Sequence, residues 1–269
     1  MEATIATKLP PQSAENTDPF AGYRKISADV LADIANKYAW IADPIHRASS
    51  YVRNMPYFEF IESMSSPQDF KSSAVQLFYH SATFPKVMGL MLGMTPLSEN
   101  HMMSFYAEHA SGEATHHQML LDWMLKYGLV KHFEELQRVI TTPETNACVN
   151  LAYQMALEQD RDKWLVSLNC GIERCSNDFF KVVAPKMSAL GVGDAYFDVH
   201  VEADEHHSIM GLEYISTKLS DQRKEVLIAK SLEGITLWAA MLHSWIGMTA
   251  FPVFNLDGSL ARRRAVVLT

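Results

Sequence analysis

Cysteine is scarce in this 269-residue chain, which contains only Cys148, Cys170 and Cys175. Their number is odd, and their spacing matches neither a CxxC pair nor a zinc finger, which argues against a disulfide framework. No secretory signal is visible, so we expect reduced thiols in a cytoplasmic protein. Each thiol is expected to be a small buried hydrophobe rather than a nucleophile.

Long apolar runs and positive charge are also lacking. No stretch approaches 18 consecutive apolar residues, so we expect no transmembrane span. The formal net charge is -8, which argues against nucleic acid as the main partner. The one basic cluster, residues 262–264, is expected to be solvated. A small-molecule substrate is the remaining expectation for a partner.

The sequence also has no internal linker rich in Pro, Gly or Ser and no alternating β pattern of any length. We therefore expect one all-α domain over residues 21–250, between a disordered tail (1–20) and a C-terminal tail (251–269). Apolar residues recur at helical spacing after residue 25, which predicts a bundle of about seven to eight helices.

Caps and breakers set the expected helix limits. Ser27 is expected to cap a first helix that ends near Asp43–Pro44, and Pro85 is expected to kink or break the second. Ser111–Gly112 is expected to interrupt the third, and Thr142 to cap a later one. The expected helical ranges are 27–43, 67–92, 98–127, 129–140, 144–190 with bends near 159–160 and at Pro185, 194–218 and 221–247.

The most informative motif is HxxxDxxH, formed by His200, Asp204 and His207. At 100° per residue these positions fall within about 60° of one another, so the three side chains leave one helical face. Such groups are costly to bury unless something coordinates them. Two imidazoles and one carboxylate suit iron, manganese or zinc.

A second candidate segment surrounds a glycine. Glu113 and His116 have ExxH spacing, and the apolar residues after His116 mark its face as directed toward the core. Glu108, on the other side of Gly112, could reach the same point if the helix breaks there. His117 points about 100° away and is the weaker candidate.

Glu173 completes the set. It shares a helical face with Val166, Asn169 and Cys170, where a carboxylate must be paired, metal-bound or exposed by a bend. Three helical regions thus supply three imidazoles and three carboxylates, enough for two neighbouring metal ions with open positions for oxygen. The other histidines stand singly or on other faces and are expected to be structural or solvated; they are His46, His80, His101, His109, His132, His206 and His243.

The order of these elements resembles the haem-oxygenase-like di-iron oxidases and oxygenases. The resemblance covers roughly residues 50–220, and its most specific parts are residues 200–207 and Gly171-Ile172-Glu173. It implies the seven-helix bundle that this family shares with haem oxygenase, the TenA proteins and pyrroloquinoline-quinone synthase.

Carried over to this chain, the resemblance makes His200, Asp204 and His207 ligands from a late helix, Glu173 the ligand from a middle helix and His116 the earlier imidazole. Family members place the partner Glu at varying distances before that His. Glu113 and Glu108 both remain candidates, with a preference for Glu108, which precedes the glycine.

The chemistry that the resemblance implies is activation of O2 by two Fe(II) ions, with Mn also possible. The substrate is expected to be amino-acid-like or an aliphatic acid, and the reaction N-oxygenation, desaturation or C–C cleavage. Related bundles often pair, so a homodimer is a further expectation.

Three alternatives stay open on the same fold. A metal-independent TenA-like hydrolase or cofactor-independent oxidase would need an acid or thiol nucleophile, for which Cys170 and Cys175 are the nearby thiols. A non-catalytic bundle would hold structural metals in a closed site. Haem binding would require a proximal imidazole, for which His46 is the one candidate near the N-terminal helix.

Overall fold

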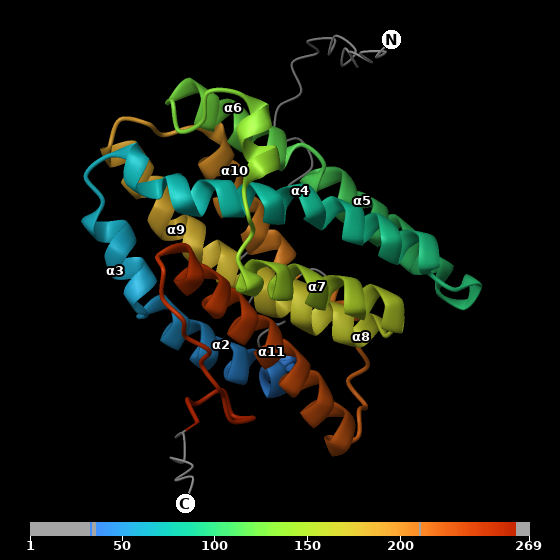
Figure 1. Ribbon diagram of the computed structural model, residues 1–269. Helices are drawn as coiled ribbons and strands as arrows, with labels where there is room; N and C mark the ends of the chain where they lie inside the picture. The colour runs from blue at the N-terminus through green and yellow to red at the C-terminus, as the bar shows by residue number, and fades with distance from the viewer. Residues whose placement is uncertain (1–32, 34–35, 210, 262–269) are drawn as a thin grey trace, which may run out of the picture.

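The computed structural model describes residue 33, residues 36–209 and residues 211–261. Within these ranges the chain is all-α, and the sole β feature is an isolated bridge between Phe254 and Leu260. The predicted all-α bundle is therefore confirmed (Figure 1). The expected cap at Ser27, the tail at 1–20 and the basic cluster at 262–264 lie outside the described residues.

The helices follow one another with short connections (Figure 1). The α-helices are α2 (Ala39–Arg53), α3 (Pro56–Ser63), α4 (Lys71–Met94), α5 (Met103–Glu113), α6 (His116–Lys126), α7 (Pro143–Glu158), α8 (Arg161–Trp164), α9 (Arg174–Ala189), α10 (Ala195–His207) and α11 (Asp221–Trp245). A π-helical stretch, Leu165–Glu173, lies between α8 and α9 and is called the π segment below. Short 3₁₀ turns cover Pro67–Phe70, Leu97–Met102, Phe133–Arg138 and Leu212–Tyr214.

Local signals account for several helix ends. The Thr142 hydroxyl accepts from the backbone N–H of Thr145 at 3.1 Å and Pro143 occupies the first turn, as predicted. Gly128 has φ 70° after α6, the left-handed conformation expected of a C-terminal cap. The bend predicted near 159–160 is also present, because Gln159 is left-handed (φ 54°) between α7 and α8.

The helix end predicted at Pro44 was wrong, and the helix does not break at Pro85. α2 continues through Pro44, where we expected it to end, and α4 continues through Pro85 without a break. A proline removes one helical hydrogen bond. Pro44 and the residues around Pro85 are buried, so tertiary packing on both sides of each proline keeps the helix continuous.

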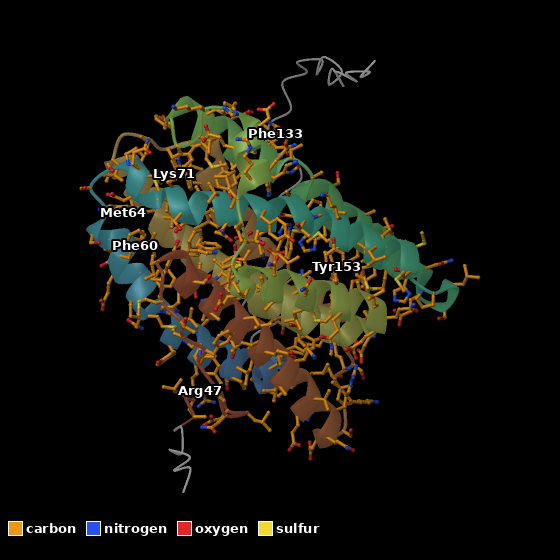
Figure 2. All side chains as sticks on the ribbon, viewed as in Figure 1. Arg47, Phe60, Met64, Lys71, Phe133 and Tyr153 are labelled. Carbon is orange, nitrogen blue, oxygen red and sulfur yellow. The ribbon has the colours of Figure 1, made fainter. Side chains whose placement is uncertain are left out.

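The core lies between two groups of helices. α4 packs on α5, α6 and α7, whereas α11 packs on the π segment, α2 and α7, and α9 lies against α10. Charged side chains such as Arg47 and Lys71 lie on the outside (Figure 2). The buried aromatic side chains of Trp123, Phe179 and Trp238 fill the space between the helices.

α11 is long and apolar enough to cross a membrane by length and composition alone, with a mean hydropathy of 1.2 in its most apolar window. In the fold, 61% of that window is buried inside the bundle, which is also what a core helix shows.

Candidate metal centre

Seven acidic and imidazole side chains meet in the bundle interior, each between 1% and 6% exposed. They come from α5, α6, the π segment and α10. They are His109, Glu113, His116, Glu173, His200, Asp204 and His207.

The α10 motif lies on one buried face, as its spacing predicted. His200, Asp204 and His207 are each no more than 5% exposed. The Nδ1–H of His200 donates to the backbone carbonyl of Tyr196 at 2.6 Å, and the ring stacks on Phe180 with centroids 4.2 Å apart. A backbone hydrogen bond to Nδ1 fixes the tautomer and leaves Nε2 available to a metal.

Glu113 and His116 are adjacent, but not within one helix. Glu113 is the last residue of α5 and His116 the first of α6, so the break falls at residues 114–115, just after the predicted Ser111–Gly112. The two side chains still meet, with His116 Nδ1 2.9 Å from Glu113 Oε2. The turn therefore directs both groups inward.

Glu108, which the sequence interpretation preferred over Glu113, does not join the cluster. Its side chain is exposed, whereas Glu113 is 6% exposed. α5 continues past Gly112 without a break, so residue 108 stays on the outer face of that helix. Of the two candidates, the structure favours Glu113.

Glu173 is positioned by the π segment. This stretch is buried along its whole length and ends at Glu173. π-helical turns are rare and occur mostly at functional sites, because the wider turn redirects a side chain. Here the Glu173 carboxylate lies 3.0 Å from His109 Nε2 and 3.5 Å from His207 Nδ1.

His109 is the residue that the sequence interpretation missed. We expected it to be structural or solvated, yet it is 1% exposed and contacts Glu173. A signal was present in the spacing. His109, Glu113 and His116 form HxxxExxH, which repeats the spacing of the α10 motif with Glu in place of Asp.

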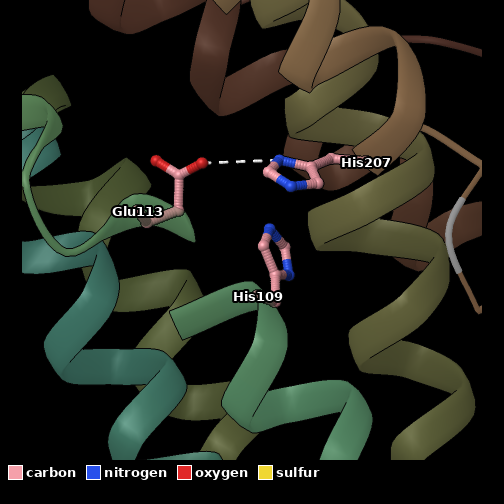
Figure 3. A group of neighbouring side chains, drawn as sticks. All are labelled: His109, Glu113 and His207. Atoms are coloured by element: carbon pink, nitrogen blue, oxygen red, sulfur yellow. Dashed lines mark ion pairs between the residues drawn. The ribbon is translucent and has the colours of Figure 1, made fainter. Parts of the chain in front are cut away.

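Three overlapping groups in the cluster have ligand atoms within 4.8 Å of one another. Figure 3 shows one of them, in which the Glu113 carboxylate and the His109 ring, both from α5, approach the His207 ring from α10. The groups are His109, Glu113 and His207; Glu113, His116 and His200; and Glu173, Asp204 and His207. Glu113 and His207 belong to two groups each, so the three groups form one continuous cluster.

The carboxylates depend on positive charge nearby. Burial alone would raise the pKa of Glu173, but His207 and His109 lower it to about 2. Burial would likewise raise the pKa of Glu113, yet His116 and His207 hold it well below its usual range. For Asp204 no neighbouring positive charge opposes the effect of burial. Burial, together with the negative charges of Glu173 and Glu113, raises the pKa of Asp204 well above its ordinary value.

The donor set fits divalent cations. Asp204 Oδ2 and His109 Nδ1 are buried without a hydrogen-bond partner among the described residues. Three carboxylates packed this closely repel one another, and a cation between them would relieve that repulsion. Imidazole and carboxylate ligands together suit iron, manganese or zinc.

Metal binding is expected to release protons. Burial would lower the pKa of His207, but Glu173 and Glu113 raise it; the pKa of Asp204 is raised too, so both groups hold their protons more strongly than free side chains do. A cation must displace these protons, so affinity for Mn²⁺ should increase as the pH rises. Calorimetric titration in buffers of different ionisation enthalpy should show net release of protons on binding. Heats that do not change between buffers would contradict this prediction.

A cavity of about 30 Å³ lies beside the cluster. Glu113, Glu173, His200 and Asp204 form one side of it, and residues of α4 and α11, including His80 and Trp238, form another. None of the described lining residues is Lys or Arg. A volume of this order admits a molecule the size of water or dioxygen. Burial lowers the pKa of His80 to about 4, so its imidazole is neutral.

The thiols are not poised for nucleophilic chemistry. Cys148, Cys170 and Cys175 are free and buried. Burial raises the pKa of Cys170 to about 12 and that of Cys175 further. A thiol nucleophile reacts as the thiolate, so both residues are inert at neutral pH.

Comparison with solved structures supports the fold. A TenA homologue from Pseudomonas syringae pv. tomato is 16% identical and superposes with a TM-score of 0.63, covering 81% of this chain and 92% of that one. A TenA homologue from Pyrococcus furiosus is 14% identical, with a TM-score of 0.50 and coverage of 77% and 97%. At these identities the likeness shows the fold alone. No curated protein matches the chain.

The sequence also matches a family model described as iron-containing redox enzyme, over residues 71–242. That range is more than half of the chain and includes all seven residues of the buried cluster. The chain belongs to this family of iron-containing redox enzymes.

Proposed function

We propose that the protein is a non-haem di-iron oxidase or oxygenase that uses O2 to oxidise a small molecule. The observation that carries this proposal is the buried set of three carboxylates and several imidazoles, grouped so that two ions could share Glu113. Membership of an iron-containing redox family supports iron over the other metals that these ligands accept.

The chain's own residues hold and insulate the metals. Glu113, His116 and His200 would hold one ion, and Glu173, Asp204 and His207 the other. Bound Fe(II) would supply the electrons for oxygen chemistry and positions open to ligands. The apolar side chains of Phe84, Phe180 and Trp238 exclude bulk water from the cavity beside these groups.

The lining of the cavity bears on the substrate class. Because no Lys or Arg lines it, an anionic group of a substrate would find its positive charge at the metals. The aliphatic part would then lie toward Phe84 and Trp238, which fits an amino-acid-like or aliphatic acid substrate. Ligand pockets usually exceed about 300 Å³, so these side chains must move aside when a substrate enters.

The alternatives account for fewer of these features. A metal-independent hydrolase with a thiol nucleophile would need a reactive Cys170 or Cys175, and both are buried and protonated. A closed structural site would have no adjacent space, yet four of the acidic and imidazole side chains border the cavity.

The test is anaerobic reconstitution. Apoprotein loaded with Fe²⁺ under nitrogen should bind about two irons per chain. Admission of oxygen should then produce a transient visible absorption, and a screen of amino and fatty acids should find one that accelerates oxygen consumption. Uptake well below two irons, with no transient, would refute the proposal.

A further inference from the structure

The two histidine motifs pair in opposite directions. His116, the last residue of HxxxExxH, lies against His200, the first of HxxxDxxH, with ring centroids 4.3 Å apart. His109, the first residue of HxxxExxH, lies against His207, the last residue of HxxxDxxH, with ring centroids 4.2 Å apart. The near-equal distances describe an approximately two-fold arrangement of four imidazoles.

Carboxylates lie beside both imidazole pairs. Glu113 Oε2 is 2.9 Å from His116, and its other oxygen, Oε1, is 3.4 Å from His207. Glu173 reaches the second pair with both oxygens, at 3.0 Å from His109 and 3.5 Å from His207. Each pair of imidazoles therefore has carboxylate oxygens between or beside its rings.

We propose that His109 is a fourth imidazole ligand, so that each of the two metal positions receives a pair of histidines. One position uses His116 and His200, and the other uses His109 and His207. This inference rests on the proposed function, because it assigns a further ligand to the same centre.

The alternative role for His109 is to position Glu173 through a hydrogen bond. Its Nε2 lies 3.0 Å from Glu173 Oε1, a distance suited to an N–H donor. Two observations favour the role of His109 as a metal ligand. A ring nitrogen of His109 lies within 4.8 Å of ligand atoms of Glu113 and His207. Its Nδ1 is also buried without a hydrogen-bond partner among the described residues.

Both metal positions have ligands at the cavity. It is bordered by Glu113 and His200 from one position and by Glu173 and Asp204 from the other. Of the four paired imidazoles only His200 lines it, so His109, His116 and His207 lie behind the ligands that border the space.

A His109→Gln variant separates the two roles. The amide of Gln can still donate a hydrogen bond to Glu173 but is a poor metal ligand. If His109 is a ligand, the variant should bind about one Mn²⁺ per chain under conditions that saturate the wild type with about two, a loss of affinity of more than about 100-fold at one position. His116→Gln should show the same loss at the other position.

The matched control is His101→Ala, which removes an exposed imidazole from the turn before α5 and should leave two ions bound. His109→Ala serves as a second variant, and circular dichroism with thermal unfolding verifies that each apoprotein folds. Retention of two ions by His109→Gln, with affinity weakened no more than about 100-fold, would overturn the ligand role and leave the proposed function intact. A wild type that binds no metal would overturn both.

Discussion

Replacing Glu113 by Gln is expected to remove at least one of two bound irons and to lower oxygen consumption by more than about 100-fold, beyond the usual cost of losing an outer-shell partner. Gln keeps the shape of the side chain but removes its charge and one of its oxygens. Glu113 is the carboxylate that contacts both imidazole pairs, through Oε2 to His116 and through Oε1 to His207. Iron content by elemental analysis and oxygen uptake at an electrode measure the two effects.

Glu108→Gln is the matched control. The two glutamates lie on the same helix five residues apart, but Glu108 is exposed and belongs to none of the three groups of neighbouring ligand atoms. This variant should retain its iron and its activity. Loss of iron from Glu108→Gln, with retention by Glu113→Gln, would reverse the assignment.

Replacing Gly234 by Ala is expected to destabilise the fold by about 1–3 kcal/mol, the usual cost of overpacking, and to reduce metal content. A Cβ at this position would lie 2.9 Å from both the backbone oxygen and the hydroxyl of Ser167. A Cβ added at Gly171, on the π segment, would likewise lie 3.0 Å from the backbone oxygen of Ser231 in α11. α11 can therefore pack closely on the π segment, and moving that segment displaces Glu173.

Gly89→Ala is the control for this second variant. Gly89 lies within α4, and a Cβ there would meet no atom within 4 Å. Replacing a helical glycine by alanine stabilises a helix by about 0.5–1 kcal/mol. Urea unfolding of both apoproteins measures the difference. Equal unfolding free energies for the two variants would show that the close contact at Gly234 carries no constraint.

Local patterns were sufficient for the fold class and for most of the cluster. Helical periodicity predicted the all-α bundle, and the spacing of His200, Asp204 and His207 predicted a shared buried face. Both properties depend on residues within a few turns of one another, so they can be inferred from the chain alone. The helix end predicted near Pro44 was wrong and no break occurs at Pro85, because a local rule does not include the packing that holds each helix together.

The sequence by itself therefore determined that the chain is acidic, cysteine-poor and helical. It also determined the set of candidate ligand groups, as polar motifs that interrupt the apolar helix faces. Only the tertiary structure decided which of them meet. Glu113 is buried and Glu108 exposed because α5 ends at residue 113 rather than at the glycine. His109 joins the cluster because α5 and α10 bring two motifs with the same spacing together in opposite directions. A spacing specifies the face of one helix, but the partner of that face depends on how distant helices pack.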